Sequence, residues 1–360
     1  MKSTRLIAGA AALVLLGTAC GSSKTTTKSA ATTAAAAAAK IDINAQAKGD
    51  CATDFLCVGV VTDVGKVDDK SFNQSAWEGA FKGANDLKGR ADYVETADPK
   101  DYGNNIKNFV DKKYDIIVTV GFGLGEETGK AATANPKIKF IGVDQFQGKA
   151  VDNYAGLIFN EDKAGFMAGA LAGLLTKSNT VAAVLGTDKV PPVVAFKVGW
   201  ENGAKHTNPK VKNISTFHPG GLDKAFSDPE WGATTAKQAL DQGADVIFGA
   251  GGKTGNGALA EIAKKKGALC VGVDTDQWAT VPEAHPCLVT SAMKLIDKGV
   301  ITLIGQAKAG SMKGGNFVGE VGLAGYHDLA SKVNADTVKK IDALIADVRA
   351  GKIDTGYKPS

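Results

Sequence analysis

The chain has 360 residues, of which 44% are hydrophobic and 22% charged, and its net charge is +4 at neutral pH. Residues 1–49 contain six Lys or Arg residues and one Asp, so 36 of the 42 basic and 37 of the 38 acidic residues lie in 50–360. A nucleic-acid-binding surface requires a basic patch on the folded part, so we expect no nucleic-acid partner. The roughly 310 remaining residues are enough for two lobes.

The first 20 residues have the pattern of an export signal. Two basic residues precede an apolar run from Leu6 to Gly17, which is short for a membrane span, and small residues lead to Cys20. The segment Leu15-Leu16-Gly17-Thr18-Ala19-Cys20 resembles a bacterial lipobox, which predicts a signal peptide over 1–19 and a lipid on Cys20. Gly17 stands where a Leu is usual in that motif. Cleavage by an ordinary signal peptidase, which would release a free exported protein, is therefore the alternative.

Residues 20–50 consist mainly of Ser, Thr, Ala and Lys, with almost no large apolar side chain. Such a segment cannot bury enough surface to offset its ordering entropy, so we expect a disordered tether. The lipid on Cys20 would hold the protein at the outer face of the cell membrane through its buried methylene groups. Apolar segments elsewhere reach only strand or helix length, so we expect no other membrane contact.

Four further cysteines form two pairs of near neighbours, Cys51 with Cys57 and Cys270 with Cys287. In an exported protein, cysteines at such spacing are expected to form disulfides. A zinc site is disfavoured because no pair has the Cys-x-x-Cys spacing of structural zinc ligands, so we expect no metal.

Strand patterns alternate with helical patterns along residues 55–144. The strands are continuous apolar runs that close at polar residues, which is typical of parallel strands buried on both faces. The helices carry apolar residues three or four positions apart. We expect strands at 55–61, 91–95, 115–120 and 139–144, and helices at 71–87, 102–112 and 125–133.

The same alternation continues through the second half of the chain. We expect helices at 162–175, 193–205, 231–242 and 254–265, and strands at 180–185, 212–217, 245–249 and 268–274. A strand that runs into a long helix over 288–309 and a terminal amphipathic helix at 335–349 complete the pattern.

This order of elements predicts an α/β protein with two doubly wound lobes. We place lobe 1 at 51–160, with 288–315 returning to it, and lobe 2 at 161–287, with 316–360 packing on it. Because the chain then crosses between the lobes more than once, the crossings would form a hinge of several segments.

One unit of sequence occurs twice, at 115–144 and at 245–274. Each copy reads as buried strand, glycine turn, helix and buried strand, and each ends on an Asp, Asp144 or Asp274. In open parallel sheets, ligands bind outside the carboxyl ends of the strands. Two such lobes facing one another would place the two Asp residues on opposite walls of a cleft, the geometry of a small-molecule receptor.

The loop at 62–79 is the strongest local signal, because it joins the carboxyl end of a strand to the start of a helix. It would bring Asp63, Asp69, Phe72 and Asn73 to one rim of the cleft. The alternative is structural: Asp68 and Asp69 would cap the unpaired N–H groups of the helix start, and Phe72 would pack in the core.

A family resemblance rests on the same loop. The run Asp-Asp-Lys-Ser-Phe-Asn-Gln-Ser-Ala-Trp-Glu-Gly at 68–79 resembles the signature of the basic membrane protein lipoproteins, the purine nucleoside receptors of ABC importers. The similarity extends over 55–350 and includes Ile-Gly-Val-Asp at 141–144 and Pro-Pro-x-x-x-Phe at 191–196. It implies a type I periplasmic-binding-protein fold, two Rossmann-like lobes that close on a nucleoside. It also implies an ABC permease as partner and a monomeric receptor.

The resemblance also implies roles for single residues. The faces of the purine would stack on Phe72 and Phe196. Its edges would be bound by Asp63, Asn73 and Asp144, and the ribose hydroxyls by Gly251, Asp274 and Lys294. The chemistry suits these groups, because aromatic rings stack on flat heterocycles and carboxylates accept hydrogen bonds from a diol. From spacing alone, Phe196 could instead be core and Lys294 an exposed helix lysine.

Catalytic patterns are weak in this chain. Its four His residues are dispersed, and neither a Gly-x-Ser-x-Gly elbow nor a His-Glu-x-x-His helix occurs. We therefore expect a binding protein without a cofactor, and not an enzyme. The alternatives are the same receptor with a sugar, another nucleoside or riboflavin as ligand, a nucleoside hydrolase that uses Asp144 and Asp274, and a cytoplasmic regulator, against which the leader argues.

Overall fold

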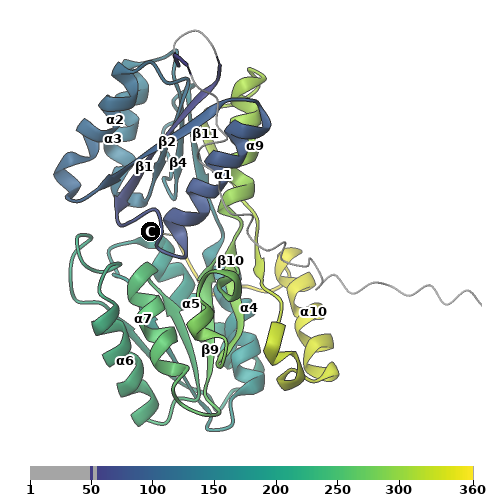
Figure 1. Ribbon diagram of the computed structural model, residues 1–360. Coiled ribbons are helices and arrows are strands. Elements are labelled where there is room, and N and C mark those ends of the chain that lie inside the picture. Colours follow the sequence, from purple (N-terminus) through teal and green to yellow (C-terminus); the bar gives the residue numbers. More distant parts are fainter. Residues whose placement is uncertain (1–48, 52–54, 360) are drawn as a thin grey trace, which may run out of the picture.

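The computed structural model describes residues 49–51 and 55–359. The predicted signal peptide, the lipid site at Cys20 and nearly all of the predicted tether lie outside the described residues. The described residues form two lobes, which Figure 1 shows one above the other.

Lobe 1 is built on a six-stranded parallel sheet in the order β11-β5-β4-β3-β1-β2. Its strands are β1 (Cys57–Val64), β2 (Arg90–Thr96), β3 (Ile116–Val120), β4 (Lys139–Val143), β5 (Tyr154–Ile158) and β11 (Gly315–Val318). Helices α1 (Phe72–Asp86) and α9 (Ile296–Lys308) cover one face, and α2 (Tyr102–Asp111) and α3 (Gly125–Ala134) cover the other (Figure 1).

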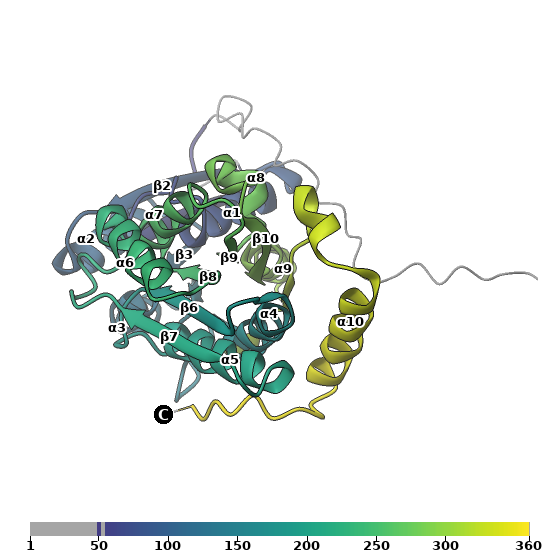
Figure 2. The same cartoon turned by 90° about the horizontal axis from the view of Figure 1, so that it is seen from below.

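Lobe 2 repeats this plan with the order β12-β10-β9-β8-β6-β7, in which β12 alone is antiparallel to its neighbour. Its strands are β6 (Thr180–Leu185), β7 (Lys212–Phe217), β8 (Val246–Ala250), β9 (Leu269–Asp274), β10 (Leu288–Lys294) and β12 (Val321–Leu323). Helices α4 (Glu161–Leu175), α5 (Pro191–Thr207) and α10 (Ala335–Arg349) lie on one face, and α6 (Pro229–Asp241) and α7 (Gly252–Ile262) on the other; Figure 2 shows α10 at the side of the lobe.

Every strand and helix predicted from the sequence is present, with bounds that differ by a few residues. The prediction missed β5, β11 and β12. The last two are only four and three residues long. Short strands of this kind are defined by their neighbours in the sheet and carry little periodicity of their own.

The predicted division between the lobes was wrong for one strand. We placed 288–315 in lobe 1, but β10 pairs with β9 in the sheet of lobe 2, and the chain returns to lobe 1 only with α9. It stays there through β11, beyond the predicted limit of 315, and then crosses to β12. A buried apolar run predicts a strand but not the sheet that it joins, because pairing is set by distant neighbours.

The chain therefore crosses between the lobes three times, after β5, after β10 and after β11. The crossings are bonded to one another. The backbone N–H of Gly319 donates to the carbonyl of Ile158, and that of Leu295 donates to the carbonyl of Glu320. The three crossings therefore form one hydrogen-bonded hinge between the lobes.

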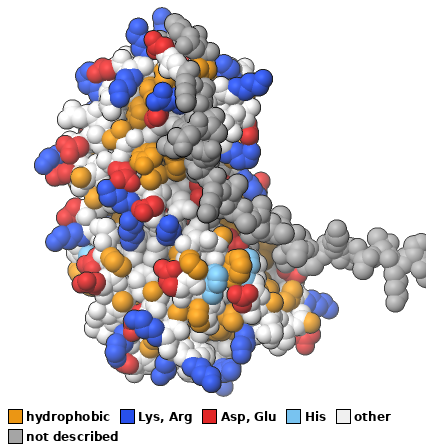
Figure 3. All heavy atoms as spheres, viewed as in Figure 1, with side chains coloured by type: hydrophobic (Ala, Val, Ile, Leu, Met, Phe, Trp, Pro, Cys, Tyr) orange, Lys and Arg blue, Asp and Glu red, His pale blue; other side chains and the backbone are white. Residues whose placement is uncertain are grey.

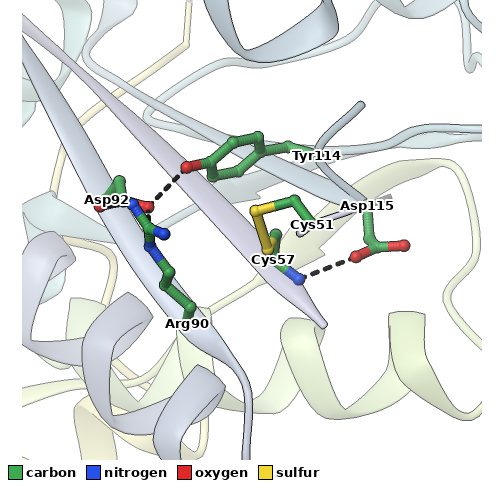
Figure 4. Close-up of a disulfide and its surroundings, with 6 residues drawn as sticks. All are labelled: Cys51, Cys57, Arg90, Asp92, Tyr114 and Asp115. Carbon is green, nitrogen blue, oxygen red and sulfur yellow. Dashed lines mark hydrogen bonds and ion pairs between the residues drawn. A yellow bond between two sulfur atoms is a disulfide. The ribbon is translucent and has the colours of Figure 1, made fainter. Parts of the chain in front are cut away.

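Both cysteine pairs are joined by disulfides in the structure, Cys51–Cys57 and Cys270–Cys287. Figure 4 shows the first, at the start of β1, where the backbone N–H of Cys57 donates to Asp115 at 2.8 Å. This end of the parallel sheet is opposite its carboxyl ends. Cys51 therefore lies at the end of lobe 1 away from the cleft.

Helices α4 and α5 pack with their backbones in contact. A Cβ atom on Gly169 of α4 would lie 2.0 Å from the carbonyl oxygen of Trp200, and one on Gly203 of α5 would lie 2.0 Å from that of Phe166. Only glycine permits such an approach. The contact fixes α5, which carries Phe196, against α4, which begins at Glu161 beside the hinge.

We expect Gly169→Ala to lower the free energy of unfolding by about 1–3 kcal/mol, because the helices must separate to admit the new methyl group. The measurement is the midpoint of thermal unfolding. Gly305→Ala is the matched control, since a Cβ at this helical position of α9 meets nothing within 4 Å. It should stabilise the protein by up to about 1 kcal/mol through helix propensity. Equal effects of the two substitutions would contradict the packing argument.

Candidate functional site

A cavity of about 470 Å³ lies between the lobes, at the carboxyl ends of the strands of both sheets. All nine residues singled out from the sequence line it: Asp63, Asp69, Phe72, Asn73, Asp144, Phe196, Gly251, Asp274 and Lys294. They come from six different segments of the chain. The fold thus brings them together, as the carboxyl-end argument requires.

Lys294 lies at the centre of this group. It is the last residue of β10, and its side chain is 2% exposed. Its ammonium lies 2.6 Å from Asp144 of lobe 1, 3.5 Å from Glu161 at the hinge and 3.9 Å from Asp274 of lobe 2. The alternative that Lys294 is an exposed helix lysine is therefore wrong.

Aromatic rings surround the same ammonium. The Nζ atom lies 4.7 Å from the ring centre of Phe72, 5.4 Å from that of Phe159 and 5.8 Å from that of Phe196. These distances are in the range of cation–π attraction. Phe72 begins α1 of lobe 1, whereas Phe196 belongs to α5 of lobe 2 and also packs edge-on against Phe248 of the core. Phe196 is thus both a core residue and part of the cavity wall.

Asp69 organises the start of α1, as the capping alternative predicted. Its carboxylate accepts hydrogen bonds from the backbone N–H groups of Ser71, Asn73 and Gln74 at 2.9–3.1 Å. Asn73 in turn donates its side-chain amide to Asp63 at 2.9 Å. The rim that these residues form is therefore held in place by hydrogen bonds.

The two repeated units end in the same backbone conformation. Asp144 has φ of 60° and Asp274 has φ of 64°, both in the left-handed region. Non-glycine residues rarely adopt it, although Asp does so more readily than most. Each Asp sits at the carboxyl end of its strand, one in each lobe, and both line the cavity.

Burial dominates the electrostatics of the site. It raises the pKa of Asp63 to about 7, that of Asp274 to about 6 and that of Glu161 to about 8. Burial also raises the pKa of Asp69 and of Asp144. Removal from water favours the uncharged acid in each case.

Two opposing effects act on the pKa of Lys294. Burial lowers the pKa of Lys294, but the attraction of Asp144, Glu161 and Asp274 outweighs it and raises the pKa above its ordinary value. The site thus contains five carboxyls whose pKa values are raised by burial and one buried lysine, which lies beside three of them, so acidic groups are in excess.

Two acceptor atoms in the cavity wall receive no hydrogen bond from the protein, Asn73 Oδ1 and Asp144 Oδ1. The two residues are 3% and 8% exposed. Buried polar atoms are nearly always paired in folded proteins. Both residues line the cavity, and these two oxygens are acceptors that the protein leaves unpaired.

The sequence analysis missed residues that complete the site. Glu161 and Phe159 flank the first crossing, and the Ser71 hydroxyl donates to Asp274 across the lobes at 2.7 Å. Leu222 and Phe226, from the segment between β7 and α6, also line the cavity. None of these residues belongs to the repeated unit or to the four rim residues. Only Ser71 lies inside the loop at 62–79.

The lobes also touch through the loop that precedes α1. The carbonyl of Lys70 accepts hydrogen bonds from Thr280 at 2.8 Å and from Gln277 at 3.3 Å, and that of Asp69 accepts one from Asn256 at 2.8 Å. Gln277 and Thr280 begin and end the short helix α8 (Gln277–Thr280) of lobe 2. The structure therefore has its lobes in contact around the cavity.

Two further observations bound the chemistry of the described part of the chain. Within residues 49–51 and 55–359, no three His, Cys, Asp or Glu residues are grouped so as to hold a metal ion. No helix in these ranges has the length and apolar character needed to cross a membrane. On the face shown in Figure 3, acidic and basic side chains are intermingled.

Comparison with known proteins places this site in context. Residues 57–324 match the model of the Bmp family, described as "ABC transporter substrate-binding protein PnrA-like". A CD4+ T-cell-stimulating antigen of Listeria monocytogenes is 34% identical and aligns over 84% of this chain and 88% of its own length. The "ABC transporter nucleoside-binding protein BmpA" of Lactococcus lactis is 30% identical over 62% of this chain and 64% of its own. An uncharacterized lipoprotein of Pyrococcus furiosus is 31% identical over 72% and 66%.

Solved structures agree on the fold. A solute-binding protein of an ABC transporter from Aeropyrum pernix superposes with a TM-score of 0.67 at 26% identity, covering 84% of this chain and 88% of its own. A transcriptional activator from Bacillus halodurans reaches 0.65 at 19% identity, covering 84% and 100%. The predicted type I periplasmic-binding-protein fold is confirmed. Because receptors and regulators share it, the fold alone does not fix the function.

We expect Lys294→Met to lower the free energy of unfolding by about 3–5 kcal/mol, because it leaves three buried carboxyls without their cation. Denaturant unfolding measures this loss. The control is Lys253→Met, which removes a partly exposed ion pair with Asp68 at 3.1 Å and should cost about 1 kcal/mol or less. A similar small loss for both would show that the carboxyls do not depend on Lys294.

The stability of the ligand-free protein should fall as pH rises from about 5 to 8. Asp63, Asp274 and Glu161 have raised pKa values in the fold, so the folded protein binds more protons than the unfolded chain in this range. The contribution of these three groups to stability is then fully present below about pH 4 and is lost as pH rises through 6–8. The measurement is the thermal midpoint as a function of pH.

Asp63→Asn tests the assignment, because asparagine keeps an acceptor for Asn73 but cannot ionise. We expect a shallower decline with pH in this variant. Asp68→Asn, at an exposed carboxyl, should leave the decline between pH 5 and 8 unchanged. If Asp63→Asn declines as steeply as the parent protein, the Asp63 carboxyl is ionised across this range.

Proposed function

Because the chain belongs to the PnrA-like family of ABC transporter substrate-binding proteins, we propose that it is a lipid-anchored extracytoplasmic receptor for a purine nucleoside. It binds the nucleoside between its lobes and delivers it to an ABC permease. The lipid is carried by Cys20, and the receptor acts as a monomer. Relatives named as lipoproteins and a relative named as nucleoside-binding support this assignment.

The observation that carries the proposal is the pair of aromatic rings contributed by opposite lobes. Phe72 and Phe196 both line the cavity and both lie within 6 Å of the Lys294 ammonium. A purine offers two flat π faces and polar edges, and such faces stack well on phenyl rings. A plain sugar would gain less from two rings, so this wall favours a flat heteroaromatic ligand.

The polar groups of the wall suit the rest of the molecule. The unpaired acceptors Asn73 Oδ1 and Asp144 Oδ1, together with Asp63, take the edge of the base. Asp274 and Lys294 take the ribose hydroxyls, and Gly251 lets the backbone approach them. A diol donates to a carboxylate and accepts from an ammonium, and such charge-assisted hydrogen bonds are stronger than neutral ones.

The charge balance favours an uncharged nucleoside over a nucleotide. The carboxyls around the cavity outnumber the one buried lysine, which already has three acidic partners. A phosphate group would add negative charge to this surplus at short range. Exclusion of phosphorylated ligands therefore follows from the same residues that bind the hydroxyls.

Ligand controls the receptor through the relative position of the lobes. A nucleoside that contacts both walls stabilises the closed state by its difference in affinity between closed and open forms. The permease then recognises the closed state. Catalysis is not required for this cycle, and Asp144 and Asp274, the pair that a hydrolase would use, both lie against Lys294.

Isothermal titration of purified protein, freed of bound ligand by unfolding and refolding, tests the proposal. We expect adenosine, guanosine or inosine to bind at micromolar affinity or tighter, and adenosine monophosphate, cytidine, ribose and riboflavin to bind weakly or not at all. Phe72→Ala should weaken binding about 10- to 100-fold, the usual range for loss of one stacked ring. Asp274→Ala should weaken it by a similar factor.

Phe146→Ala is the matched aromatic control, because Phe146 is 72% exposed and lies outside the cavity wall. It should leave affinity unchanged. Binding of ribose or riboflavin alone would keep the receptor and discard the nucleoside. Release of free base from the bound nucleoside, detected by chromatography, would indicate the hydrolase instead.

A further inference from the structure

The segment between β7 and α6, residues 219–227, links the cavity wall of lobe 2 to lobe 1. Four of its residues line the cavity, namely Leu222, Asp223, Phe226 and Ser227. It rises from lobe 2 toward lobe 1 beside α6 (Figure 1). We propose that Leu222 is an apolar latch that closes against Gly123 of lobe 1 and slows release of the ligand. The proposal rests on the nucleoside-binding function and deepens it.

Both ends of this segment are firmly attached to lobe 2. The buried His218 donates its backbone N–H to the carbonyl of Gly186 at 2.8 Å, and its ring accepts a hydrogen bond at Nδ1 from the backbone of Gly220 at 2.9 Å. Asp228 accepts from the backbone of Trp231 and donates its own N–H to Thr254, both at 2.9 Å. His218 Nε2 faces the Asp228 carboxylate at 3.4 Å.

The middle of the segment is also ordered by internal contacts. The backbone N–H of Ala225 donates to Gly221 at 2.9 Å, and the Ala225 side chain is fully buried. The carbonyl of Phe226 accepts from Lys253 at 3.0 Å, and its ring packs over Gly186, where a Cβ would lie 2.3 Å from the ring. Leu222 is therefore presented from a rigid support, as a positioned contact must be.

Leu222 meets lobe 1 at the turn that follows β3. A Cβ atom built on Gly123 would lie 3.3 Å from a Leu222 methyl group and 3.4 Å from the ring of Tyr102. Gly123 belongs to the short helix η3 (Phe122–Leu124) and lines the cavity, as does Tyr102. The Leu222 side chain thus occupies the space above a glycine, with the Tyr102 ring beside it.

This apolar contact differs in kind from the polar contacts between the lobes. The loop before α1 is held to lobe 2 by hydrogen bonds to the carbonyls of Asp69 and Lys70, groups that water also satisfies when the lobes part. Leu222 instead buries apolar surface against lobe 1, and it does so only while the lobes are together. Removal of that surface from water is favourable. Its free energy therefore counts toward the closed state alone.

A contact made only in the closed state slows opening and leaves ligand entry into the open state unaffected. Leu222→Ala should therefore raise the rate of ligand dissociation about 3- to 10-fold and change the association rate less than twofold. Affinity differences among variants of one site usually reside in the dissociation rate. Leu222→Met, which restores an apolar side chain of similar length, should return the rate to near that of the parent protein.

Stopped-flow displacement measures these rates. The probe is 2-aminopurine riboside, a fluorescent purine nucleoside, displaced by excess inosine. Lys224→Ala is the control, because this exposed residue of the same segment does not line the cavity. An unchanged dissociation rate in Leu222→Ala, or a fall in association rate alone, would overturn the latch while leaving nucleoside binding in place.

A second measurement reads the contact itself. In inosine-saturated protein, which populates the closed state, hydrogen exchange at residues 121–125 should be faster in Leu222→Ala than in the parent protein and unchanged in Lys224→Ala. Unchanged exchange in Leu222→Ala would reject the latch. If no purine nucleoside bound to the parent protein, titration of the parent would show this first, and the proposed function and the latch that rests on it would both fail.

Discussion

A buried cluster of one lysine and three carboxylates joins the two lobes of this molecule. The ammonium of Lys294 lies within 4 Å of a carboxylate from lobe 1, a carboxylate from lobe 2 and Glu161 at the first crossing of the chain. A buried charge without partners is too costly to keep. Because the partners come from both lobes, the lysine is fully compensated only when the lobes are together, and hinge and cavity form one electrostatic unit.

The same arrangement explains how a bound ligand stabilises the closed state. Five carboxyls and one lysine leave a surplus of acidic groups at buried positions, and burial pushes those acids toward their protonated forms. A ligand rich in hydrogen-bond donors relieves that cost, and it does so only where both walls can reach it. Affinity and closure then depend on the same contacts, as a receptor that reports its loaded state requires.

The sequence was sufficient for most of the elements and for much of the cavity wall. Repetition located Asp144 and Asp274, and the rule that ligands lie at the carboxyl ends of parallel strands brought the rim residues to the same place. It was not sufficient for β10, whose apolar run does not specify a sheet, nor for Glu161 and Leu222. Their importance arises from neighbours more than 100 residues away or in the other lobe, and no local pattern records such neighbours.

Unusual backbone conformations also occur at the junction between the lobes. Among the non-glycine residues with left-handed φ, Lys88 and Lys113 follow the ends of helices α1 and α2, where this conformation commonly closes a helix. Lys70, Asp144 and Asp274 have no such reason, yet all three lie where the lobes meet. Glycine would suit their backbone better and would supply no carboxylate at the two Asp positions. At the two Asp positions, the need for a side chain in the cavity therefore outweighs the conformational preference of the backbone. Functional sites commonly depart in this way from the local rules that otherwise shape a fold.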